Sequence, residues 1–163
     1  KRAATALPVR RVAPRPGARD VVPLYTLIAS AGVQGRADLA QVGEWVTVDG
    51  HKVAAGAFVL RVSGDSMAPK IPDGALVLFR APVSEPDGKI VLVEFSEGGV
   101  DPHYLVKKVA IDWRGQAGTG IVRTKLASLN DKYPPRRVEL SGESGVRLVA
   151  EMVAVLSATN RTE

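Results

Sequence analysis

The chain has 163 residues, with 22 lysines and arginines, 17 aspartates and glutamates, and no cysteine. This length suits one compact domain that buries a real core. The absence of cysteine excludes a disulfide scaffold, a thiolate metal site and a cysteine nucleophile. The longest apolar runs are short and strand-like, well under the roughly 18 residues that a membrane-spanning helix needs, so no membrane association is expected.

The net charge of +5 lies entirely in residues 1–20, which hold six basic side chains and one acidic one, whereas the other 143 residues hold 16 of each. Three prolines and scattered arginines give this leader no helical or strand period, which predicts a linker or tail. We expect it to join a missing N-terminal domain. A basic arm that touches DNA backbone and an artificial leader are the alternatives. The domain itself is expected to span residues 21–163.

Beyond residue 20, short runs rich in Val, Ile and Leu alternate with turn signals, as in antiparallel all-β domains. Two stretches look mildly helical, residues 37–42 and the turn near 66–70. The predicted fold is mostly β, with twisted antiparallel sheets and few short helical turns. Its expected strands are residues 22–28, 44–48, 58–62, 75–80, 89–95, 104–111, 120–125, 138–140 and 146–156.

A serine follows one of these strands, in the sequence SGDSMAP at residues 63–69. A serine in a tight turn after a buried strand presents its Oγ, and the neighbouring N–H groups are free to line an oxyanion pocket. Any serine in a glycine-containing turn shares this geometry. Ser66 therefore becomes a candidate nucleophile only if the chain also supplies a base.

A lysine can serve as the base if burial keeps it neutral near the working pH. Side chains alternate along a strand, so Lys107 shares its face with Leu105, Val109 and Ile111. Lys108 lies on the opposite face, among smaller or amphipathic neighbours. A lysine among aliphatic side chains costs stability unless it is neutral or paired, so Lys107 is the better candidate. The alternative is that Lys107 extends its amine to the surface.

These residues resemble the self-cleaving serine peptidases of the LexA/UmuD type, which include the C-terminal domains of LexA-like and phage-type repressors. The serine motif at 63–67, followed by Pro69, Asp73-Gly74 and an aliphatic strand, looks like that family's nucleophile box. The sequence LVKKV at 105–109 looks like the strand with the catalytic lysine. Residues 129–135 resemble the late S-x-N-x-x-Y-P segment, and residues 22–32 look like the segment that carries the self-cleavage bond.

The resemblance implies a Ser-Lys dyad without a cofactor. Ser66 would be the nucleophile and Lys107 the general base, and the backbone N–H groups of Ser66 and Met67 would hold the oxyanion. The substrate would be the chain's own Ala31-Gly32 bond, within a cleavage-site segment over 21–43, and its cleavage is expected to release the basic leader. The neighbouring bonds 29–30 and 35–36 remain candidates.

The sequence departs from the family in three places. Ser30 stands where a small apolar residue is usual, the loop after Phe95 is longer than in compact members, and no helix-turn-helix is present in these residues. His51 and His103 lie in polar, turn-like contexts without a second ligand at useful spacing, so no metal site is expected.

Three functions are compatible with these features. The first is a cytoplasmic, stress-responsive bacterial regulator that cleaves itself. The resemblance implies that it forms a homodimer, is triggered by a RecA filament on single-stranded DNA, and contacts DNA only through the missing domain. The second is a non-cleaving dimerisation domain of a phage-type repressor. The third is a protease module, related to LexA or to signal peptidases, that acts in trans within a larger effector.

Overall fold

The computed structural model describes residues 7–12, 20–29, 37–48, 53–96, 102–114, 120 and 122–158. This part of the chain contains no helix, and hence none that is long and apolar enough to cross a membrane. Its ten strands are β1 Leu7–Val12, β2 Val21–Ala29, β3 Ala37–Val48, β4 Ala57–Arg61, β5 Leu76–Arg80, β6 Ile90–Phe95, β7 His103–Arg114, β8 Val122–Ala127, β9 Arg136–Leu140 and β10 Val146–Ala158.

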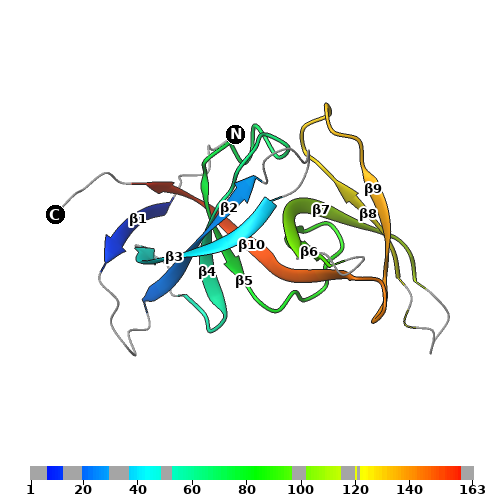
Figure 1. Cartoon of the computed structure of the whole chain (residues 1–163), viewed down its shortest axis with the longest axis horizontal. Coiled ribbons are helices and arrows are strands. Elements are labelled where there is room, and N and C mark those ends of the chain that lie inside the picture. The colour runs from blue at the N-terminus through cyan, green and yellow to red at the C-terminus, as the bar shows by residue number, and fades with distance from the viewer. Residues whose placement is uncertain are drawn as a thin grey trace.

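The ten strands form one sheet in the order β1-β3-β2-β4-β5-β10-β6-β7-β8-β9. Because β1 also pairs with β10, the first six strands of this order form a closed ring, which is a small barrel. β10 continues beyond the ring and pairs with β6, from which β7, β8 and β9 extend the sheet. In Figure 1 the orange-to-red β10 runs through both halves. Two register shifts within β10 allow it to bend between them.

The sheet is mixed. β1 runs parallel to β10 and β2 runs parallel to β4, while the other pairs among the described strands are antiparallel. The prediction of a mostly β fold is confirmed. The described residues contain no helix. The expected turn near residues 66–70 is present as a single turn, closed by the hydrogen bond from the N–H of Ile71 to the carbonyl of Met67. Two strand pairs are parallel where antiparallel pairing was expected.

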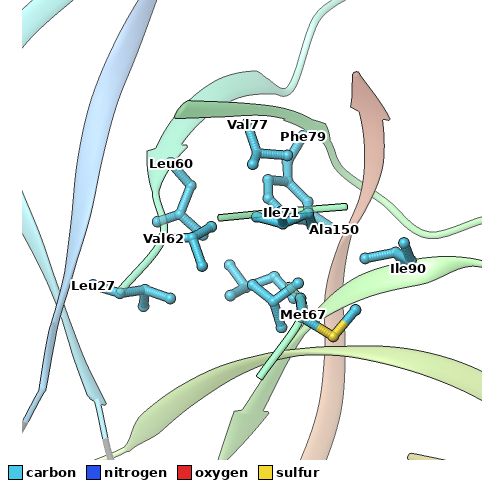
Figure 2. Close-up of a cluster of buried hydrophobic side chains, with 11 residues drawn as sticks. Leu27, Leu60, Val62, Met67, Ile71, Val77, Phe79, Ile90 and Ala150 are labelled. Carbon is cyan, nitrogen blue, oxygen red and sulfur yellow. The ribbon is translucent and has the colours of Figure 1, made fainter. Parts of the chain in front are cut away.

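Side-chain alternation along β4 and β5 divides the core. On one face of these strands, Val59, Leu76 and Leu78 pack with residues of β2, β3 and β10 inside the ring. On the other face, Leu60, Val77 and Phe79 enter a second cluster, which is drawn in Figure 2. This cluster also contains residues of the turn after β4 and of β6, β7 and β10, namely Met67, Ile71, Ile90, Leu92, Val106 and Ala150.

A third cluster fills the extension of the sheet. Its buried members come from β6, β7, β8 and β10: Val91, Val93, Phe95, Val109, Leu126 and Val146. β7 therefore sends alternate side chains into two cores, with Val106 in the second cluster and Val109 in the third. Because side chains alternate along β7, Lys107 lies on the same face as Val109, toward the third cluster.

Two local predictions are wrong. Residues 37–42, expected to be mildly helical, form the first half of β3, where they pair with β2 from Ala29↔Ala37 to Tyr25↔Gln41. Residues 7–12, within the segment predicted to be a linker or tail, form β1. β1 is held by backbone pairing to β3 and β10, and Pro8 is tolerated because it lies near the start of the strand. Backbone pairing with neighbouring strands of the sheet outweighs local propensity in both places.

Candidate active site

The turn that carries Ser66 follows β4 and is fixed by backbone contacts. The N–H of Ala68 donates to the carbonyl of Asp65 at 3.0 Å, and the N–H of Ile71 donates to the carbonyl of Met67 at 2.9 Å. Met67 is 1% exposed and packs into the second cluster (Figure 2), whereas Ser66 beside it is only half-buried. The buried methionine anchors the turn and leaves its neighbouring serine closer to solvent.

Lys107 lies in the middle of β7, opposite Val91 of β6. Val109 is buried in the third cluster, and Leu105 and Ile111 pack against it, so the face predicted for Lys107 is apolar. Lys107 is half-buried and Lys108 is exposed. Burial lowers the pKa of the Lys107 ammonium below its ordinary value, because loss of water disfavours the charged form.

The polar partner of Lys107 is Ser128. Lys107 Nζ donates a hydrogen bond to Ser128 Oγ at 2.6 Å. The β7–β8 register pairs Lys108 with Ala127, so Ser128, the residue after β8, faces Lys107 at the next position. Within the described part of the chain, the hydrogen bond of Nζ therefore goes to Ser128 and not to Ser66.

The residues after Ser128 bind the Ser66 turn. The backbone N–H of Asn130 donates to the carbonyl of Ser66 at 3.0 Å, and its Nδ2 donates to the carbonyl of Asp65 at 3.0 Å. The hydroxyl of Tyr133 donates to the carboxylate of Asp65. We call residues 128–133 the bridging segment, because it contacts Lys107 through Ser128 and the Ser66 turn through Asn130 and Tyr133.

The described structure thus attaches Ser66 and Lys107 to a common segment. Ala31 and Gly32, the predicted cleavage site, lie outside the described residues. β2 and β3 pair up to Ala29↔Ala37, so residues 30–36 connect two hydrogen-bonded strands. β3 also approaches β7, the strand that carries Lys107.

Sequence reasoning missed Ser128. Its contact with Lys107 depends on the pairing register of β7 and β8, which alternation within a single strand does not reveal. The available signal was positional, since Ser128 stands two residues before Asn130, in the serine place of the S-x-N-x-x-Y-P pattern. Among the described residues, no group of three His, Asp or Glu side chains is placed to hold a metal ion.

Comparison with known families bears on this site. A family model described as Peptidase S24-like matches residues 23–153 of the chain. The matched region begins in β2 and ends in β10, and it includes the Ser66 turn, Lys107 and the bridging segment. A comparison with curated proteins found no match.

Proposed function

Since the chain belongs to the Peptidase S24-like family and has a LexA/UmuD-type peptidase domain, we propose that it is a self-cleaving serine endopeptidase that uses Ser66 and Lys107. The observation that carries the proposal is the half-buried lysine, attached through the bridging segment to the turn of the candidate serine. A purely structural lysine gains nothing from a site that disfavours its charge.

The base in this proposal is the neutral amine of Lys107. Burial lowers its pKa, which raises the fraction of amine that can accept a proton near neutral pH. The position explains the burial, because β7 is an inner strand between β6 and β8 and the flanking side chains on that face are aliphatic.

The oxyanion site would be formed by the backbone N–H groups of Ser66 and Met67. Neither of these groups donates a hydrogen bond to another described residue, whereas the N–H groups of Gly64 and Ala68 in the same turn do. Unpaired N–H groups beside the nucleophile can stabilise the negative charge that develops on the carbonyl oxygen of the substrate.

The reaction proceeds in two halves. Ser66 Oγ attacks the carbonyl carbon of Ala31 while its proton passes to Lys107 Nζ. The tetrahedral intermediate collapses, the bond to the nitrogen of Gly32 breaks, and the Lys107 ammonium returns the proton to the leaving amine. Water then attacks the Ala31 ester with Lys107 as base. This step restores the Ser66 hydroxyl and leaves a new carboxylate on Ala31.

The Ala31-Gly32 bond is the proposed substrate because it falls within residues 30–36, between β2 and β3. A bond in this connection is close in sequence to β3, and β3 approaches the strand of Lys107. The bonds 29–30 and 35–36 fall at or within the same connection, so the mass of the products must decide among the three.

We further propose that the domain belongs to a bacterial regulator of the SOS type, which responds to DNA damage. In this proposal it is a cytoplasmic homodimer whose self-cleavage is stimulated by a RecA filament on single-stranded DNA. Its link to DNA would run through a further domain. These features rest on the resemblance to LexA-like repressors.

The decisive experiment is to hold the purified protein at about pH 7 and about pH 10, with and without RecA filaments, and to identify the products by mass spectrometry. We expect faster cleavage at the higher pH and fragments that end at Ala31 and begin at Gly32. Ser66→Ala and Lys107→Ala should abolish cleavage, and Lys108→Ala is the matched control that should not.

A second candidate is a non-cleaving dimerisation domain, as in a phage-type repressor. The observation that favours it is the hydrogen bond of Lys107 to Ser128 rather than to Ser66. No cleavage under any of these conditions, with a dimer unchanged by Ser66→Ala, would support it. Adding wild-type protein to a labelled Ser66→Ala substrate chain tests the third possibility, cleavage in trans.

A further inference from the structure

The bridging segment holds both residues of the proposed dyad, and Ser128 is its contact with Lys107. Ser128 and Lys107 are both half-buried, and a hydrogen bond that is shielded from water is stronger than an exposed one. From Asn130 onward the same segment is fixed to the Ser66 turn. A displacement of Ser128 would therefore change the position of the lysine amine relative to the serine.

We propose that Ser128 is a positioning residue that orients the amine of Lys107 toward Ser66, an inference that rests on the peptidase function proposed above. A neutral amine has two N–H donors and one lone pair. When Ser128 Oγ accepts one N–H, rotation about the Cε–Nζ bond is restricted and the lone pair has a defined direction. After Lys107 takes the proton of Ser66, the same oxygen accepts an N–H of the ammonium.

The surroundings of Lys107 make this hydroxyl important. Val91 of β6 and Ser128, the residue after β8, stand on either side of Lys107, and neither is charged. On β3, which approaches β7, Glu44 is paired with Arg11 at 3.5 Å. On the Ser66 turn, the Asp65 carboxylate accepts the hydroxyl of Tyr133. Orientation by a neutral hydroxyl leaves the effect of burial, which favours the uncharged amine, unopposed, whereas a nearby carboxylate would favour the ammonium.

The first test measures self-cleavage against pH for the wild type, Ser128→Ala and Ser128→Thr. Ser128→Ala should lower the plateau rate at high pH by about tenfold or more, the loss typical of one hydrogen bond to a charged group. It should also move the midpoint of the profile to lower pH, because the ammonium loses an acceptor. Ser128→Thr keeps a hydroxyl and should restore both values. Ser96→Ala, an exposed serine that bonds to the carbonyl of Gly145, is the control.

The second test does not require cleavage. In the inactive Ser66→Ala background, the lysines are labelled with ¹³C at Cε and titrated by NMR, and the Lys107 signal is assigned by its loss in Lys107→Arg. Adding Ser128→Ala should lower the pKa of Lys107 further and leave that of Lys108 unchanged. A merely structural serine would change neither pKa. Urea unfolding of each variant identifies any that fails to fold. If Ser128→Ala does not fold, the titration of Lys107 is compared between the wild-type serine and Ser128→Thr.

The two proposals fail separately. If the wild type never cleaves but Ser128→Ala still shifts the Lys107 titration, the peptidase function is wrong and the Lys107–Ser128 contact stands. If the wild type cleaves and Ser128→Ala changes neither the rate profile nor the titration, the positioning role is wrong. Cleavage that survives Ser66→Ala but not Ser128→Ala would make Ser128 the nucleophile and overturn both assignments.

Discussion

The carboxylate of Asp73 accepts a hydrogen bond from the backbone N–H of Gly64 at 2.7 Å. Gly64 has a φ of +93°, in the region that favours glycine. The contact joins the start of the Ser66 turn to the turn that precedes β5. It gives a physical reason for the Asp-Gly pair that follows the serine motif in the sequence, since Asp73 helps to fix the turn that presents Ser66.

Removing this carboxylate should therefore slow cleavage as well as reduce stability. Asp73→Ala should lower the free energy of unfolding by about 1 kcal/mol, as expected for one hydrogen bond, and slow self-cleavage several-fold. Asp87→Ala is the matched control, because Asp87 accepts the N–H of Ile111 at 2.9 Å away from Ser66. It should cost similar stability without slowing cleavage. Urea titrations and timed gels measure the two effects, and equal loss of cleavage in both variants would contradict the assignment.

The lowered pKa of Lys107 predicts a stability that depends on pH. Because its pKa is lower in the folded than in the unfolded state, the unfolded chain binds more protons between the two values. The free energy of unfolding therefore rises with pH across this window. Lys107→Met should remove this contribution, stabilise the fold at neutral pH and abolish cleavage. Lys108→Met, at the exposed neighbour, should leave the pH dependence intact.

A buried carboxylate in β10 predicts a dependence of the same sign, in the acid range. Glu151 is 4% exposed and accepts hydrogen bonds from Lys89 at 2.5 Å and from Arg80 at 3.0 Å. The hydrogen bond from Lys89, followed by that from Arg80, lowers the pKa of Glu151. Its stabilisation is complete above the unfolded-state pKa and is lost as the pH falls through the folded-state value.

Glu151→Gln should lower the free energy of unfolding by about 1–3 kcal/mol at neutral pH, because two hydrogen bonds lose their charge and both cations are partly exposed. The difference from the wild type should shrink in acid. Urea unfolding at several pH values measures it. A difference that stays constant down to the acid limit would show that Glu151 does not act through its charge. Glu139→Gln, at an exposed ion pair with Arg123, is the control.

Two tyrosines allow a test of the bridging segment. The hydroxyl of Tyr133 donates to Asp65 in the Ser66 turn, and that of Tyr104 donates to Glu94 at 2.8 Å in the β6–β7 pair. Tyr133→Phe should slow self-cleavage by a few-fold, because the turn loses one of its contacts with the segment, whereas Tyr104→Phe should not. Cleavage rates at a fixed pH decide the matter, and equal rates in the two variants would count against the role of Tyr133.

Alternation within single strands was enough to predict much of the fold and the environment of Lys107. The nine predicted strands correspond to β2–β10, with β3 longer than expected. Lys107 lies on an aliphatic face because the neighbouring odd-numbered residues of β7, Leu105, Val109 and Ile111, are aliphatic. Candidate catalytic residues that lie in one strand or one turn, such as the serine of the SGDSM motif, can likewise be identified from the sequence.

Features that depend on pairing between strands were not predictable in this way. Residues 37–42 contain helix-forming Ala, Leu and Gln, yet β2 supplies partners for their backbone groups. Residues 7–12 show no alternation in the sequence, yet backbone pairing with β3 and β10 holds them in a strand. Ser128 reaches Lys107 only through the register of β7 and β8. Alternation within one strand does not give this register, which also depends on the turn that joins the two strands.

The closed ring has a consequence for what a cut in residues 30–36 would achieve. β1 and β2 lie before the cut and supply two of the six ring strands; β2 is bonded to β3 and β4, and β1 to β3 and β10. Hydrolysis alone would therefore produce a nicked particle whose two pieces stay interlocked, and not a free leader. The two pieces should co-elute on a sizing column and part only in denaturant. Breaking the bond and losing the fragment become separate events, and the second is limited by opening of the barrel.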